Sequence, residues 1–88
     1  MIFIVLFKFR RKATKADLDK ANKYFAQAAK DWGIKTIGTW WTLGRWDGVR
    51  IYEARNEKVA MKFALSGPAL ATTETLVAMS RDEAVKLL

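Results

Sequence analysis

The residues best suited to hold a small molecule gather in one stretch of the chain. Trp40, Trp41 and Trp46 stand close together, and Arg50 and Tyr52 follow at alternate positions. Aromatic walls that carry a few polar groups are how small-ligand sites are built. A guanidinium binds anions, and a tyrosine hydroxyl can donate a hydrogen bond beside it. The stretch therefore indicates a site for an aromatic or acidic small molecule.

Arg50 also has a structural interpretation. A charged side chain on a strand must be paired or solvated, and Glu74 is a possible partner on another predicted strand. An Arg50–Glu74 ion pair at an interface is thus the alternative to an anion site. Both interpretations predict that Arg50→Ala weakens either ligand binding or self-association.

The composition excludes much familiar chemistry. The 88 residues contain no histidine and no cysteine, which excludes disulfides, zinc–thiolate sites, cysteine nucleophiles and Ser-His-Asp arrangements. We accordingly predict neither a metal nor a cofactor. Glu53 and Glu74 are the only carboxylates expected inside strands, and a buried glutamate can act as a general base. An acid–base enzyme thus remains an alternative.

Apolar periodicity and capping residues predict the elements that position these side chains. Thr14 with Asp17 begins the longest helix, Gly33 ends it, and Asn56 begins the next. The predicted elements are a strand over 2–9, a helix over 15–32, strands over 34–43 and 49–54, a helix over 57–66, a strand over 72–79 and a short helix over 81–88.

This order predicts one α+β domain over residues 1–88 with a ferredoxin-like βαββαβ arrangement and a short C-terminal helix. We expect a four-stranded antiparallel sheet with both main helices on one face, and parallel pairing of the strands over 2–9 and 49–54. We expect Val49 and Ile51 to face the helices, so that Arg50 and Tyr52 point to the other face.

The second face of the sheet requires a cover. The strand over 2–9 is apolar at both alternating sets of positions, and Trp40 and Trp41 point to opposite faces. Soluble monomers rarely expose an apolar patch of that size. Two-fold dimers are the commonest oligomers, so we expect a homodimer with the two sheets face to face, or a higher oligomer of such dimers.

Residues 44–48 read as the turn of a hairpin. Asp47 before Gly48 is a turn signature, because Asp caps local backbone N–H groups and Gly accepts a positive φ. Large aromatic residues beside the turn would anchor it to the core. This purely structural interpretation of the stretch stands beside the ligand-binding one.

Residues 40–48, Trp-Trp-Thr-Leu-Gly-Arg-Trp-Asp-Gly, resemble the GYD domain family, whose motif is close to Tyr-Trp-Thr-Leu-Gly-x-Tyr-Asp. Trp40 and Trp46 stand where the family usually has tyrosine; the matching positions, with the following glycine, are Trp41, Thr42, Leu43, Gly44, Asp47 and Gly48. The resemblance implies a dimeric α+β barrel over the whole chain. Related barrels include cofactor-independent monooxygenases, haem-degrading enzymes, isomerases and ligand-sensing modules, so the fold alone does not specify the function.

The net charge of +7 is concentrated near the N-terminus, with five basic residues between Lys8 and Lys15. Nucleic acid is therefore a further alternative partner. The aromatic platform for stacked bases would be Phe3, Phe7 and Phe9 with Tyr52.

The apolar run at residues 1–7 is far shorter than the roughly 20 residues of a membrane-spanning helix, and basic residues follow rather than precede it. We expect a cytoplasmic protein without a membrane partner. The preferred function is binding or sensing of a small molecule by a homodimer. The first alternative is a cofactor-independent monooxygenase or isomerase acting on a small aromatic substrate.

Overall fold

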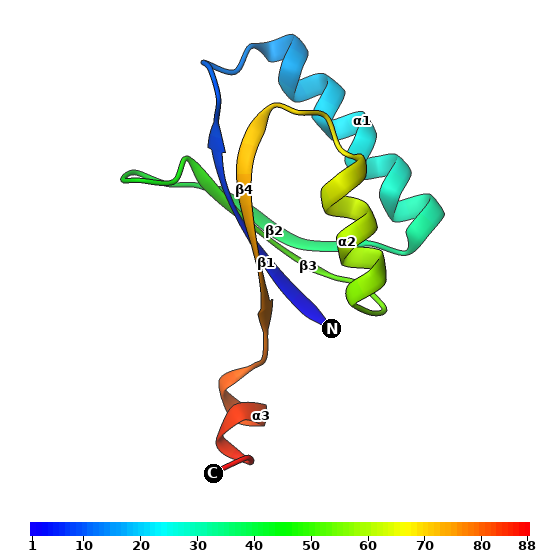
Figure 1. Cartoon of the computed structure of the whole chain (residues 1–88), viewed down its shortest axis with the longest axis vertical. Helices are drawn as coiled ribbons and strands as arrows, with labels where there is room; N and C mark the ends of the chain where they lie inside the picture. Colours follow the sequence, from blue (N-terminus) through cyan, green and yellow to red (C-terminus); the bar gives the residue numbers. More distant parts are fainter.

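The computed structural model describes residues 1–88 and has the predicted order of elements (Figure 1). None of its three helices has the length and apolar character needed to cross a lipid bilayer. The elements are β1 (Ile2–Phe9), α1 (Lys15–Trp32), β2 (Lys35–Trp41), β3 (Gly48–Glu53), α2 (Glu57–Ser66), β4 (Ala71–Ala78) and α3 (Arg81–Val85).

The helix boundaries follow from local capping. Thr14 accepts a hydrogen bond from the Asp17 backbone N–H, and the Asp17 carboxylate accepts one from the Thr14 N–H at 3.0 Å. Gly33 ends α1 with a φ of 68°, and Asn56 caps α2 by accepting from the Val59 N–H. These contacts satisfy backbone groups that a helix end leaves free, so the predicted bounds of both helices are confirmed.

The four strands form one antiparallel sheet in the order β2-β3-β1-β4, with α1 and α2 on the same side of it (Figure 1). The predicted ferredoxin-like α+β fold is confirmed. The expected parallel pairing of β1 with β3 is wrong. The α1 crossover returns β2 parallel to β1, and the hairpin then reverses β3, so β3 runs antiparallel to β1.

The predicted facing of β3 is also wrong. Tyr52 lies opposite Phe3, and Arg50 lies opposite Val5, on the side of the sheet that α1 and α2 cover. Tyr52 and Phe3 are fully buried, and the Tyr52 ring packs edge-on against Phe63 of α2 at 5.1 Å. β1 is apolar at both alternating sets of positions. The set with the bulkier side chains, which contains Phe3, is the one that faces the helices.

The other side of the sheet has no helix over it (Figure 1). Half of the Trp40 side chain is exposed there, and Leu76 is 41 % exposed. We call this surface the open sheet face. It is formed by Ile2, Ile4, Leu6, Trp40, Val49, Ile51 and Leu76, which share one side through the strand register.

The C-terminal segment stands away from the rest of the molecule, beyond the end of β4 (Figure 1). Ser80 caps α3 by accepting from the Glu83 N–H. The helix ends at Val85 rather than at the predicted Leu88, because the last residues form tighter turns that join residues three apart, such as the Leu88 N–H donating to Val85 O at 3.2 Å. Val85, Leu87 and Leu88 are exposed.

Candidate functional site

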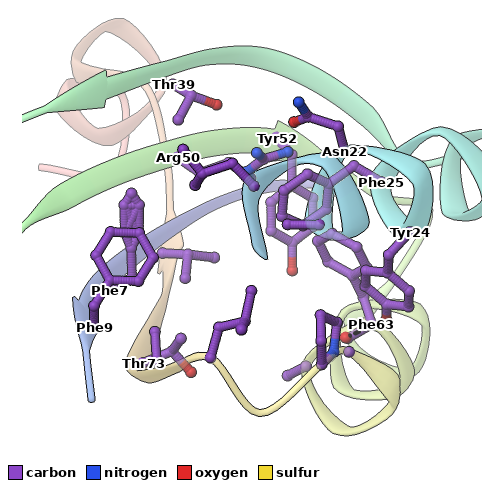
Figure 2. A pocket seen from close by; sticks show the side chains of 18 of the residues that line it. Phe7, Phe9, Asn22, Tyr24, Phe25, Thr39, Arg50, Tyr52, Phe63 and Thr73 are labelled. Carbon is purple, nitrogen blue, oxygen red and sulfur yellow. Dashed lines mark hydrogen bonds between the residues drawn. The ribbon is translucent and has the colours of Figure 1, made fainter. Parts of the chain in front are cut away.

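A cavity of about 320 Å³ lies between the helix-covered side of the sheet and the two main helices. Its walls come from all four strands, from α1 and α2, and from the segment at residues 67–70 (Figure 2). The volume is at the lower end of the range for small-molecule sites. Most of the lining is apolar, with Val5 of β1 and Leu18 of α1 on opposite walls.

Aromatic rings form the inner end of the cavity. Tyr24 of α1 stacks on Phe63 of α2 with ring centres 5.5 Å apart, and Phe25 meets the same Phe63 edge-on at 5.9 Å. The Tyr24 hydroxyl donates to the Phe63 carbonyl oxygen at 2.7 Å, and burial raises the pKa of Tyr24. The Tyr24 hydroxyl therefore already donates a hydrogen bond within the fold, and it remains neutral near pH 7.

Arg50 brings the only formal charge among the residues that line the cavity. Its Cζ lies 3.4 Å from the centre of the Phe25 ring, a close cation–π contact. Its one polar contact is a long hydrogen bond to the Thr36 hydroxyl at 3.3 Å. Burial lowers the pKa of Arg50 to about 10, so the guanidinium stays positive near neutral pH.

Tyr52 is the most buried side chain in the molecule, yet its hydroxyl has no hydrogen-bond partner. Figure 2 shows the hydroxyl pointing into the cavity. Burial, with the nearby Tyr24 as a second cause, raises the pKa of Tyr52 to about 12. Buried polar groups are nearly always satisfied, so an unpaired one requires an explanation.

Trp41 forms part of the cavity wall at its exposed end. Its ring stacks on Phe9 at 5.2 Å and tilts against Phe7 at 6.0 Å, while 60 % of the residue remains exposed. The structure thus brings three of the predicted site residues, Trp41, Arg50 and Tyr52, to one cavity.

The other predicted site residues lie elsewhere. Trp40 points to the open sheet face, and Trp46 sits in the β2–β3 loop with the Arg45 guanidinium 5.8 Å from its ring. Glu74 lies opposite Leu6 and therefore on the open sheet face. Arg50 is on the other side of the sheet, so the predicted Arg50–Glu74 ion pair is wrong.

The helix residues that complete the cavity had been assigned only to the core or not singled out. Phe25 and Phe63 belong to the apolar stripes of their helices, and Tyr24 lies beside the stripe of α1. Helical periodicity shows that such residues face the sheet, but it does not show that their side chains leave a cavity between the helices and the sheet. The fold, rather than any local pattern, creates this part of the site.

The loop between β2 and β3 is held by its own motif residues. The Thr42 N–H donates to Asp47 O at 2.9 Å, and the Thr42 hydroxyl donates to Trp46 O at 2.7 Å. Gly44 has a φ of 113°, which favours glycine. These contacts end β2 at Trp41, two residues before its predicted end, and confirm the predicted hairpin.

The role predicted for Asp47 is corrected in one respect. Its carboxylate accepts from the Phe9 N–H at 2.8 Å instead of capping N–H groups inside the turn. The Asp47 N–H in turn donates to Phe7 O, also at 2.8 Å. Asp47 therefore fastens the loop to the end of β1, next to the two phenylalanines at the cavity mouth.

We expect Asp47→Ala to lower the free energy of unfolding by about 1.5–3 kcal/mol, the range for a hydrogen bond to a charged group. Urea denaturation monitored by tryptophan fluorescence measures the change. Asp47→Asn keeps a side-chain oxygen acceptor and should lose less. Equal losses for the two variants would show that Asp47 stabilises the protein through its negative charge and not by accepting a hydrogen bond from the Phe9 N–H.

No curated protein matches the sequence. The family model for the GYD domain matches residues 3–88, which include all four strands apart from Ile2 of β1, both main helices, α3 and the Trp41–Gly48 motif. Because this match spans nearly the whole chain, the chain belongs to the GYD domain family.

Proposed function

We propose that the protein binds a small organic molecule in the cavity between the sheet and the two main helices. The observation that carries the proposal is the unpartnered Tyr52 hydroxyl, which is buried and directed into a largely apolar cavity of about 320 Å³. A ligand that accepts a hydrogen bond would satisfy this group. Apolar walls with a few directed polar groups are typical of ligand sites.

The titratable groups around the cavity favour binding over acid–base catalysis. No aspartate or glutamate lines it. Arg50 stays protonated near pH 7, and the raised pKa values of Tyr24 and Tyr52 keep both hydroxyls neutral. General acid–base catalysis works best when a group titrates near the working pH. The monooxygenase or isomerase alternative therefore finds less support here than binding or sensing.

We propose further that a second copy of the chain covers the open sheet face. The face is apolar at its centre and carries both signs of charge at its margins, with Lys8 and Lys35 against Glu53 and Glu74. A two-fold contact can place such opposite charges against each other. The detached α3 supports the same assembly, because a five-residue helix is not stable without a surface to pack on.

Nucleic-acid binding receives less support. Phe3, Phe7, Phe9 and Tyr52 all lie on the helix-covered side of the sheet, so they form no exposed platform for bases. Arg11, within the basic segment, is paired with Asp17 at 2.9 Å. The expected stacking surface is therefore wrong, and the basic segment alone gives only the nonspecific attraction that any cationic surface has.

A neutral, environment-sensitive dye, N-phenylnaphthylamine, tests the cavity directly. We expect its fluorescence to rise on binding and Thr73→Trp to weaken binding by about tenfold or more, because overpacking a site costs about 1–3 kcal/mol. Thr73 lines the cavity, whereas Met61 is exposed on α2 and lies outside both the cavity and the open sheet face. Met61→Trp is therefore the control for the added indole. Equal dye binding by the two variants would place the dye outside the cavity.

A further inference from the structure

The cavity contains hydrogen-bond donors without matching acceptors. Arg50 and Tyr52 lie two residues apart on β3 and face the same side, about 7 Å apart along the strand. The guanidinium has only the long contact to Thr36, and the Tyr52 hydroxyl has no partner. A guanidinium cannot accept a hydrogen bond, and a neutral phenol donates readily. These two groups on β3 therefore require hydrogen-bond acceptors.

The charge of the missing group follows from the lining. Arg50 is the only ionisable cation that lines the cavity, and no carboxylate lies there to neutralise it. A desolvated charge without a partner is unfavourable, and a bound anion would relieve that. One guanidinium matches one negative charge. A monoanion therefore fits better than a phosphate ester, which carries close to two charges at neutral pH.

The position of Arg50 favours a planar anion. Its flat group lies over the Phe25 ring, with Cζ 3.4 Å from the ring centre, so one face is covered. One N–H of Nη1 is directed to Thr36, and the other N–H groups remain for a ligand. Guanidinium edges bind carboxylates through two parallel hydrogen bonds. Thr39 of β2 lies opposite Arg50, and Figure 2 shows the Tyr52 hydroxyl pointing in another direction, toward the middle of the cavity.

We infer that the ligand is a small organic monocarboxylate with an aromatic or otherwise apolar body and a second oxygen acceptor along that body. Arg50 binds the carboxylate, Tyr52 donates to the second oxygen, and the rings of Phe7 and Phe63 contact the body. The inference rests on the proposed function and specifies the ligand class for the same cavity.

Three matched probes test the inference through displacement of N-phenylnaphthylamine. Phenylbutyrate supplies the carboxylate, phenylbutyramide is its neutral counterpart, and benzoylpropionate adds a keto oxygen to the chain. We expect phenylbutyrate to bind about ten- to a hundredfold more tightly than the amide, as a hydrogen bond to a charged group implies. Benzoylpropionate should bind about fivefold more tightly again, the gain from one neutral hydrogen bond.

The variants separate the two contacts. Arg50→Met should bring the acid and the amide to equal affinity, Arg50→Lys should keep part of the preference, and Tyr52→Phe should remove only the advantage of the keto oxygen. Arg55→Met removes the same charge from an exposed position outside the cavity and should change nothing. The preference of the unmodified protein for the acid over the amide is itself a test. The inference can therefore be tested even if a variant does not fold.

Two results would overturn the inference for different reasons. If Thr73→Trp weakens dye binding but the amide competes as well as the acid, or neither competes, the cavity binds ligands without recognising a carboxylate. The proposed function then stands and the ligand class is wrong. If the dye does not bind and no probe changes the fluorescence of Trp41 or the other tryptophans, the proposed function and the inference both fail.

Discussion

Replacement of Ile51 by aspartate is expected to leave the protein monomeric. Ile51 lies near the middle of the open sheet face, in a row that crosses the sheet through Gly38, Ile51, Ile4 and Leu76. In a two-fold dimer both copies would bury the new carboxylate. An unpaired buried charge costs several kcal/mol, so we expect the dissociation constant to rise by about a thousandfold or more.

Sedimentation equilibrium over a dilution series measures this effect. The unmodified protein should have a mass of about twice 10.0 kDa or a multiple of that, and Ile51→Asp a mass near 10.0 kDa. Met61→Asp places the same charge on an exposed position of α2 and should stay dimeric. Near-ultraviolet circular dichroism shows whether the variant is folded. A monomeric unmodified protein, or a dimeric Ile51→Asp, would contradict the proposed interface.

The open sheet face shows what strand alternation can and cannot predict. The sequence correctly indicated that β1 is apolar on both sides and that Trp40 and Trp41 diverge. It could not indicate which side the helices cover, because both sides of β1 are apolar enough to be buried. A simple preference for burying valine and isoleucine over arginine gave the wrong result for β3. Arg50 is tolerated on the covered side because its flat charged group packs on Phe25.

Local signals predicted the boundaries of α1 and α2 well. The reciprocal Thr14–Asp17 contacts, the left-handed Gly33 and the Asn56 cap are all made within a few residues of the helix ends they define. Such contacts depend on chain geometry alone and hardly on the rest of the fold. Where an end depends on distant residues, as with Asp47 and the N–H of Phe9, the sequence identified the residue but not its partner.

The cavity could not be predicted from local patterns. Its arginine and its unpartnered hydroxyl come from β3, its aromatic end comes from α1 and α2, and its exposed end comes from Trp41 and β4. The tryptophans looked like one cluster in the sequence, yet alternation and the loop send Trp40, Trp41 and Trp46 to three different surroundings. Proximity along a strand and its hairpin is therefore a poor guide to a shared site.

Gly48 shows how a correct identification can rest on the wrong reason. The residue was expected to adopt a positive φ, but only Gly33 and Gly44 do so. Gly48 is buried at the start of β3, directly opposite Phe7 of β1. A Cβ atom added to Gly48 would overlap the Phe7 ring and lie 2.7 Å from the Trp40 carbonyl oxygen. Close approach of neighbouring strands, and not turn geometry, requires glycine here.

We therefore expect Gly48→Ala to lower the free energy of unfolding by about 2–3 kcal/mol, the upper range for overpacking. Urea denaturation measures the loss. Gly38→Ala is the matched control on β2: the nearest atoms to its Cβ all belong to the Trp40 indole, a half-exposed side chain that can move, so the loss should be smaller.

A second substitution separates the two clashes at Gly48. Phe7→Leu removes the ring that the new methyl group overlaps, but it leaves the Trp40 carbonyl oxygen in place. The loss of stability in the double variant Gly48→Ala/Phe7→Leu should be about 1 kcal/mol smaller than the sum of the two single losses. A coupling of that size is expected for residues in direct contact. A loss below about 0.5 kcal/mol for Gly48→Ala, which is typical of uncrowded surface sites, would show that β1 and β3 have room for a side chain. The mouth of the cavity would then be looser than the contacts among Phe7, Phe9 and Trp41 indicate.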